Sequence, residues 1–348
     1  MNVAVKCAAI LASAIFIYGC SKESGKRKAG EKASVTVYCS VDPEFAEPLL
    51  AEFSKSSGIE VHHVFDTEAG KTTGLMNKLS AEKGSPRADV WWSSEVFGTI
   101  QLADAGIFDA YSPKTAADVP DRYKDKGGRW TAIGLRGRVI AFDPSRTKKE
   151  DLPKRWCDLV QPKYKNRFRM ADPRFGTTRG HMATLTALWG EPAMKAFYLR
   201  LRDNGTTLTD GNSQSVLQVT RGLADFAATD TDDCVAAKLQ GASIEMHYPD
   251  LDAPSGSPRV AGTLWIPCSV GLVKGGPNPE AGRKLVDYLV SADVEGKLAR
   301  SDSRNVPVRR ALRDQLHVDC PGEAKVDYAA AAKMLDLSDR LVGEVLLR

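Results

Sequence analysis

The pattern of apolar and polar positions predicts alternating strands and helices over residues 35–94. Residues 35–40, VTVYCS, are rich in β-branched and aromatic side chains, which indicates a short strand. A helix should begin at residues 42–44, because Asp can cap free N–H groups, Pro fits the first turn and Glu favours the positive end of the helix dipole. Gly58 is a stop signal. The predicted inner face of this helix consists of Ala46, Leu49, Leu50 and Phe53.

The same alternation continues with a strand at residues 59–65, a helix at residues 72–84 and a strand at residues 88–94. Strand, helix, strand, helix, strand is typical of an open parallel sheet that is covered by helices on both faces. A further helix should run through residues 93–111 and end near Gly106. The first part of the chain is therefore predicted to be an α/β lobe.

The rest of the chain predicts a second lobe and a return to the first. Residues 129–144 are strand-rich and should carry the chain across, and residues 262–275 should carry it back. Helical periodicity marks most of the segments after residue 176, including the C-terminal stretch. Two crossings between lobes predict a hinged molecule, which can close on a ligand that contacts both lobes.

Several stretches in this order resemble the periplasmic solute-binding proteins of the ferric-iron type, which feed ABC importers. They include VTVYCSVDPEFAEPLLAEFSKSSGIEV, PRADVWWSSE, RGRVIAFDP, ADPRFGTTRGHMATL, GNSQSVLQVTRGLADFAATDTDD and WIPCSVGLVKGGPNPEAGRKLVDYLVS. Together they cover most of residues 35–310. The resemblance implies an α/β protein with a two-lobed periplasmic-binding-protein clamshell of type II, each lobe a mostly parallel sheet flanked by helices. It also implies a monomer whose partners are the importer's permease and ATPase.

The predicted lobe boundaries follow from the crossings. Lobe 1 is expected to comprise residues 34–137 and 262–305, and lobe 2 residues 138–261 and 306–348.

The N-terminus is typical of an exported lipoprotein. Residues 1–19 contain one early charge and a short apolar run, which has the length of a signal-peptide core. IYGC resembles a lipobox, which predicts lipid attachment at Cys20 and a membrane-anchored protein on the periplasmic or cell-surface side. A plain secretory signal is the alternative. Residues 20–33 are polar and mostly basic, and they are predicted to form a flexible tether.

Composition limits the other classes of function. The chain has 348 residues, a formal net charge of +4 and 43% apolar residues, which suits two soluble lobes and gives no indication of a nucleic-acid partner. Beyond Cys7 and Cys20 five cysteines remain, an odd number, so at least one thiol should stay outside any intramolecular disulfide. No CxxC motif indicates a structural zinc site.

Polar residues at strand-to-helix corners are the candidate ligand contacts, because ligands bind at the carboxyl ends of strands in open α/β sheets. In the second lobe, Gly176, Thr177 and Thr178 begin a helix and could bind an anion with help from nearby arginines, Arg174 and Arg179. The alternative role of each corner is an ordinary helix cap or scaffold. The remaining candidates are Ser40, Thr72, Ser93 and Glu95 in the first lobe, Arg138 in the crossing strand, and Asn212.

The segment TDTDD at residues 229–233 is the candidate metal site. Asp230 and Asp232 follow a strand of small residues, and carboxylates are hard oxygen donors that can bind ferric or divalent ions. In iron-binding members of the family a pair of neighbouring tyrosines binds Fe(III) in about this region, and this sequence lacks that pair. Tyr248 is a further candidate phenolate ligand. We expect no resident cofactor, and Fe(III) would be a transported ligand.

The sequence thus predicts a substrate-binding lipoprotein of an ABC import system, of the iron(III) type, that holds one small ligand between its lobes. The alternative is a binding protein for a small organic anion such as an organophosphate or phosphonate. An enzyme is not expected, because neither HExxH nor GxSxG occurs and His181 on the 176–190 helix is better explained by packing. An exported deaminase of porphyrin precursors on a similar fold, and a purely structural lipoprotein, are the other classes left open.

Overall fold

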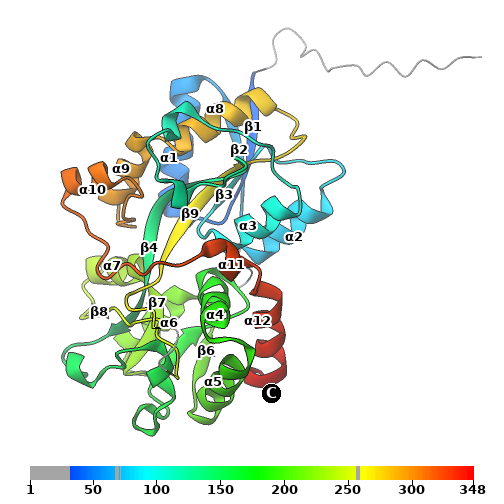
Figure 1. The fold of residues 1–348 in the computed structure, drawn as a ribbon. Helices are drawn as coiled ribbons and strands as arrows, with labels where there is room; N and C mark the ends of the chain where they lie inside the picture. The colour runs from blue at the N-terminus through cyan, green and yellow to red at the C-terminus, as the bar shows by residue number, and fades with distance from the viewer. Residues whose placement is uncertain (1–31, 67–69, 71, 256–258) are drawn as a thin grey trace, which may run out of the picture. The chain divides into compact units, whose positions relative to one another are not determined.

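The computed structural model describes residues 32–66, 70, 72–255 and 259–348. The predicted signal peptide and Cys20 lie outside the described residues. Residues 33–348 form one compact unit, which contains two β-sheets joined through a shared strand (Figure 1). The strand order is β2-β1-β3-β9-β4-β7-β5-β6, and β8 pairs with β4 outside this path.

The first sheet is built by the N-terminal part of the chain and one returning strand. In it β1 pairs in parallel with β2 and β3, while β9 runs antiparallel to both β3 and β4. The predicted return near residue 265 is therefore confirmed. Its strands are β1 (Ser34–Cys39), β2 (Glu60–Phe65), β3 (Val90–Ser93), β9 (Trp265–Leu272) and the first half of β4 (Thr131–Phe142).

The second sheet contains the other half of β4. Here β4 runs antiparallel to β7 and β8, and β5 pairs in parallel with β6 and β7. The sheet consists of β4, β5 (Phe168–Ala171), β6 (Thr207–Thr209), β7 (Phe226–Asp230) and β8 (Glu245–His247).

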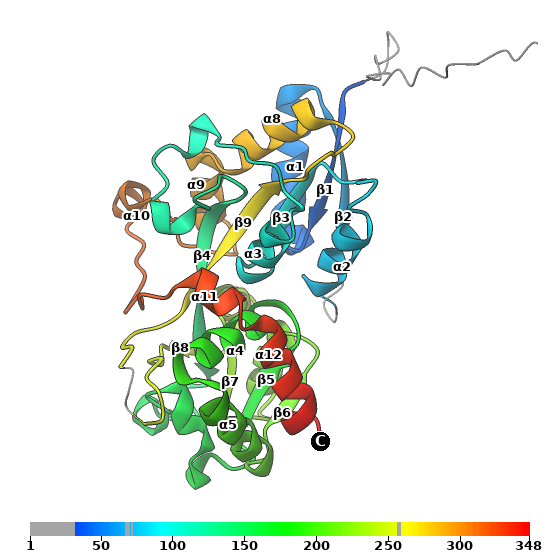
Figure 2. The same ribbon diagram turned by 45° about the vertical axis from the view of Figure 1, so that its right-hand side comes forward.

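Both sheets are mixed, whereas the sequence predicted mostly parallel sheets. The difference arises at the two crossing strands, β4 and β9, which enter against the direction of their neighbours. Strand β4 changes its partner between Gly137, which pairs with Trp265, and Arg138, which pairs with Asp230. The two-lobed α/β architecture is confirmed, and Figure 2 shows one sheet in the upper half of the unit and the other in the lower half, with β4 running between them.

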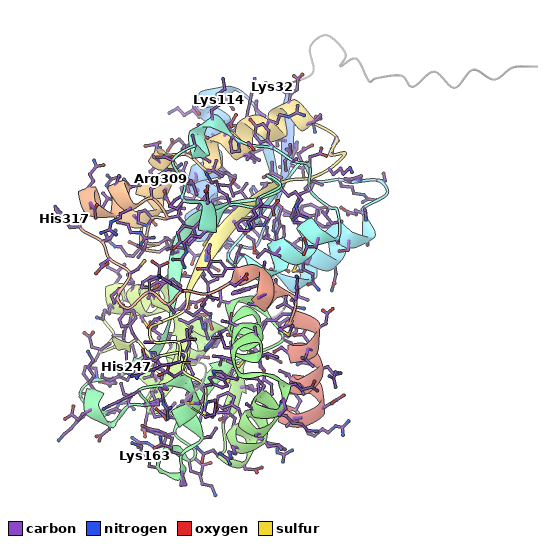
Figure 3. All side chains as sticks on the ribbon, viewed as in Figure 1. Lys32, Lys114, Lys163, His247, Arg309 and His317 are labelled. Carbon is purple, nitrogen blue, oxygen red and sulfur yellow. The ribbon has the colours of Figure 1, made fainter. Side chains whose placement is uncertain are left out.

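Helices flank both sheets. Helix α1 begins at Pro43 and ends at Ser57, and the next residue, Gly58, caps it as predicted with a φ of 69°, the left-handed conformation that glycine favours. Figure 3 places Lys114 on the side of the first sheet and Lys163 at the opposite end of the unit, beyond the second sheet. The helices nearest the first sheet are α1 (Pro43–Ser57), α2 (Thr73–Ala81), α3 (Phe97–Asp104), α8 (Pro279–Leu289) and α9 (Ala292–Arg300), and those nearest the second are α4 (Gly176–Trp189), α5 (Glu191–Asp203), α6 (Asn212–Thr220) and α7 (Thr231–Leu239).

The C-terminal segment, residues 306–348, contacts both groups of helices. Helix α10 (Arg310–Leu316) packs on α9, α11 (Tyr328–Ala332) lies on both α3 and α4, and α12 (Leu335–Leu341) packs on α4 and α5. The buried Tyr328 donates its hydroxyl to the carbonyl oxygen of Trp265 at 2.8 Å. This segment therefore connects the two lobes in addition to β4 and β9.

Candidate functional site

The first lobe contributes a cluster of hydroxyl groups at its strand ends. Ser40 follows β1, and its hydroxyl accepts hydrogen bonds from Thr72 at 3.2 Å and from the backbone N–H of Ser94 at 3.1 Å. Ser93 lies 3.4 Å from Ser40, hydroxyl to hydroxyl. All four side chains are buried. The structure thus brings together the serines and the threonine that the strand-end argument selected.

Glu95 lies directly after this cluster and caps helix α3. Its carboxylate accepts hydrogen bonds from the backbone N–H groups of Phe97 at 2.6 Å and Gly98 at 3.1 Å. Complete burial raises the pKa of Glu95 to about 7, although these N–H groups and Arg179 oppose the rise. The printed hydrogen bonds of this carboxyl group go to backbone N–H groups at the start of α3, which makes Glu95 a helix cap.

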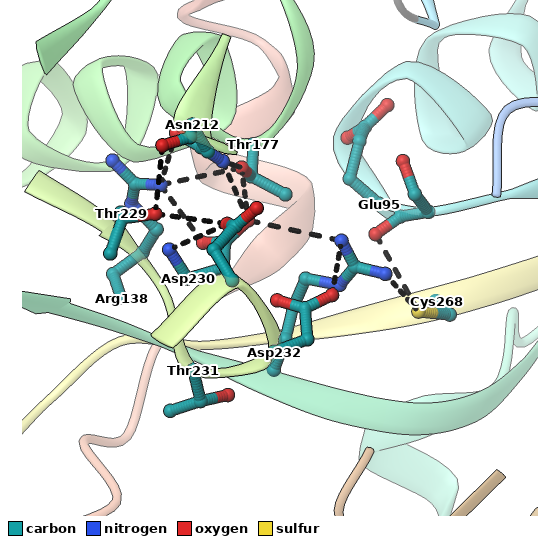
Figure 4. A network of polar contacts seen from close by, with 12 residues as sticks. Glu95, Arg138, Thr177, Asn212, Thr229, Asp230, Thr231, Asp232 and Cys268 are labelled. Carbon is teal, nitrogen blue, oxygen red and sulfur yellow. Dashed lines mark hydrogen bonds and ion pairs between the residues drawn. The ribbon is translucent and has the colours of Figure 1, made fainter. Parts of the chain in front are cut away.

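Asp230 is the centre of the second lobe's cluster (Figure 4). Its carboxylate is fully buried and accepts hydrogen bonds from Arg138 at 2.9 Å, Thr177 at 2.5 Å and Asn212 at 2.9 Å. Thr178 donates to the side-chain oxygen of Asn212 at 3.2 Å. Four predicted site residues therefore surround Asp230 as one network, and Arg138 lies wholly inside the protein.

Asp230 also begins helix α7 as part of a capping box. Its backbone N–H donates to Asp233 at 3.3 Å, and Thr229 donates to the same carboxylate at 2.9 Å. Oxygen atoms of Asp230, Asp232 and Asp233 lie within 4.8 Å of one another. Three carboxylates at this separation repel one another unless cations lie among them.

Arg136 is one such cation, and the sequence analysis did not select it. Its Nη1 lies 3.0 Å from Asp232 and 3.9 Å from Asp230, and only 4% of the side chain is exposed. Burial alone would lower the pKa of Arg136, but the facing carboxylates, Asp232 above all, raise it well above its usual value. The spacing of two from Arg138 was the available signal, since residues i and i+2 of a strand share a face.

Two adjoining spaces lie against these clusters. A narrow cavity of about 30 Å³ touches Ser94, Arg136, Gly176 and Asp230. A wider groove of about 610 Å³ separates the start of α1 from α6 and α7. Their described linings include Arg136 and eight carboxylate residues, namely Asp42, Asp172, Asp210, Asp230 and Asp233 in the cavity and Asp42, Glu44, Asp66, Asp232 and Asp233 in the groove.

Other candidates lie away from these spaces. Tyr248 stacks on Trp265 with ring centroids 6.3 Å apart, and it lines neither the cavity nor the groove. Arg174 pairs with Asp172, and Arg179 pairs with Asp339 of α12 at 2.8 Å, so neither is aimed at the helix start as expected. His181 is fully buried against Trp156, as its packing role predicted.

The thiols of Cys157, Cys234, Cys268 and Cys320 are buried and form no disulfide, and Cys39 is buried as well. Cys268 contacts two residues that line the cavity, the guanidinium of Arg136 and the carbonyl oxygen of Ser94. Within the described ranges, no helix combines the length and apolar character that crossing a membrane requires.

The model of the family described as "Bacterial extracellular solute-binding protein" matches residues 98–334, more than half of the chain. The chain belongs to this family. It is a family of transport proteins, and the resemblance inferred from the sequence is thereby confirmed.

The relatives of this solute-binding protein include proteins named for iron and proteins named for a phosphonate. It is 24% identical to "Iron uptake protein A1" of Synechocystis sp. over 315 residues, which cover 88% of this chain and 84% of that protein. It is 25% identical over 260 residues to a Salmonella typhimurium periplasmic protein named for binding 2-aminoethylphosphonate, with 74% and 72% of the two chains covered.

The fold of this solute-binding protein is shared by known structures. The apo ferric ion-binding protein A of Pasteurella haemolytica aligns with a TM-score of 0.77 at 22% identity, covering 90% of this chain and 97% of that one. Likeness at this level of identity concerns the fold.

Proposed function

We propose that this solute-binding protein is the cargo-capturing component of an ABC importer and that its cargo is ferric iron. The observation that carries the proposal is the acidic cluster of Asp230, Asp232 and Asp233 at the cavity and groove, with oxygen atoms within 4.8 Å of one another. Carboxylate oxygens are hard ligands, which suit a small, highly charged cation. Iron-named relatives cover most of the chain and support the same cargo.

The cargo would lie between two lobes, which we propose comprise residues 34–137 with 262–305 and residues 138–261 with 306–348, where α10 of the last segment packs back on α9 of the first lobe. The change of partner along β4 after Gly137 supports a hinge at this point. Asp42 of the first lobe lines both spaces together with Asp233 of the second. A cation bound between carboxylates of the two lobes stabilises the closed form because only that form supplies both sets of oxygen atoms.

The proposed contacts divide by lobe. Ser40, Thr72, Ser93 and Glu95 would shape the first lobe's wall, while Arg138, Thr177, Thr178 and Asn212 hold the second lobe's carboxylates. Gly176 begins α4 beside the cavity with φ of 53°. Because the hydroxyl of Thr177 donates to Asp230, its role in this arrangement is to orient an acid group.

A small organic anion, such as a phosphonate, is the second candidate cargo. The start of α4 and the guanidinium of Arg136 both touch the cavity, and such groups favour anions. The eight carboxylates around the cavity and groove weigh against it, since like charges repel.

We further propose that the mature protein is attached to a membrane by lipid at Cys20. The lipobox-like IYGC supports this. Mass spectrometry of the mature N-terminus tests it, and an unmodified N-terminus at another residue would refute it.

Ferric iron should raise the melting temperature of metal-stripped protein, because a ligand that binds the native state stabilises it. At a free concentration of 100 times Kd the gain is about 2.7 kcal/mol. Iron supplied as a weak chelate should stabilise the parent and the exposed control Asp302→Asn equally. Asp232→Asn should lose most of the shift relative to its own metal-free form. Stabilisation by 2-aminoethylphosphonate and not by iron would reverse the choice of cargo.

A further inference from the structure

Arg136 occupies the place that a bound cation would need. It lies on β4, where it pairs with Ile266 of the first sheet, one residue before β4 changes partner. Its guanidinium crosses to the second lobe's carboxylates, at 3.0 Å from Asp232 Oδ2 and 3.9 Å from Asp230 Oδ2. These oxygen atoms belong to the cluster to which we assign the cargo.

The closest ion-pair contacts of the Arg136 guanidinium are with Asp232 and Asp230. Its Nη2 has the Sγ of Cys268 at 3.8 Å, and sulfur is a weak acceptor. Its Nε is buried and has no hydrogen-bond partner among the described residues, as is also true of the Nε of Arg138, so the two arginines differ in the contacts of their Nη atoms. Arg138 differs, because it donates to Asp230 and to oxygen atoms of Asn212, Thr177 and Thr178, which fix it in place. Of the two arginines, Arg136 is the one that can leave its carboxylate at the lower cost.

We propose that Arg136 acts as a resident cation at the cargo site and thereby lowers the affinity of the site for every incoming cation. The proposal rests on the cation-binding function proposed above. An incoming cation must displace the guanidinium from Asp232 before it can bind that carboxylate. This exchange adds the same cost for every cation, so weakly bound divalent ions fall below useful affinity while a strongly bound trivalent ion does not.

The charge-removing substitution Arg136→Gln tests this. We expect it to tighten binding of both ferric iron and Mn²⁺ on the order of tenfold or more, because the competitor is gone. Arg136→Lys, which keeps a competing charge, should stay near the parent. Arg146→Gln is the matched control, since Arg146 pairs with Asp143 outside the cavity and groove at 2.9 Å. Calorimetric titration of metal-stripped proteins gives the affinities.

The outcomes separate the two proposals. If the parent binds ferric iron and Arg136→Gln binds iron and Mn²⁺ no more tightly, Arg136 is not a competitor and the inference is wrong. If neither protein binds ferric iron or Mn²⁺, the proposed function fails and the inference fails with it.

Should Arg136→Gln not fold, Arg136→Met removes the charge while keeping an apolar stem for the buried position, and the same comparison applies.

Discussion

Asp230→Asn should lower the free energy of unfolding of the metal-free protein by about 3–5 kcal/mol, the cost of leaving a buried charge without its partner. Arg138 is completely buried and lies 2.9 Å from Asp230, and it also donates to the neutral oxygen atoms of Thr177, Asn212 and Thr178. An asparagine keeps the size and the acceptor oxygen but removes the negative charge. The loss should therefore reflect charge, with little change in packing.

Urea unfolding followed by tryptophan fluorescence measures this loss. Asp230→Asn combined with Arg138→Met should cost less than the sum of the two single changes, because the double variant buries no unpaired charge. The control is the exposed pair of Lys238 and Glu245 at 2.9 Å, where Glu245→Gln should cost at most about 1 kcal/mol. If Asp230→Asn lowered the free energy of unfolding no more than this control, the buried pair of Asp230 and Arg138 would not be needed for stability.

Gly180→Ala should weaken cargo binding on the order of tenfold to a hundredfold by resisting closure of the lobes, at a cost of about 1–3 kcal/mol. Gly180 lies on α4, and a Cβ atom there would come within 2.0 Å of the ring of Phe97 on α3. Both residues are buried, and a ring cannot turn away as the end of a flexible side chain can. Opening of the hinge would relieve the contact.

Isothermal titration with ferric iron tests this effect, and Phe97→Leu in the Gly180→Ala background should restore part of the affinity. Gly343→Ala is the matched control, because a Cβ atom at this helical glycine meets nothing within 4 Å. Unchanged affinity in Gly180→Ala would show that α3 and α4 need not approach this closely when cargo is bound.

Much of the local structure could be predicted from the sequence because local chemistry decides it. The buried residues of α1 are Ala46, Leu49, Leu50 and Phe53, as the helical period required. The directions of β4 and β9 in their sheets could not be predicted, since strand direction depends on distant partners. Arg136 was missed although its spacing from Arg138 placed both on one face of the strand, because the sequence does not show that the carboxylates of the second lobe lie opposite this face.

In the candidate site, too, the sequence could predict what local chemistry decides and could not predict what depends on distant partners. Strand-end reasoning selected Ser40, Thr72 and Ser93, which the structure brings together, because such ends converge in any open α/β sheet. Tyr248 was selected by residue type alone, and the ring of Trp265 on which it stacks is brought to it by the tertiary fold. The sequence could not show whether Thr177 contacts a ligand or supports another residue. In the structure its hydroxyl donates to Asp230, so it supports that carboxylate.

Anomalous diffraction at the iron edge, from crystals grown with ferric iron, tests the central proposal most directly. The account predicts an iron peak between the two lobes, with carboxylate oxygens of the Asp230, Asp232 and Asp233 cluster among its ligands. An iron peak at a distance from these residues, or no iron peak in crystals whose cavity instead holds an organic anion at the start of α4, would contradict it.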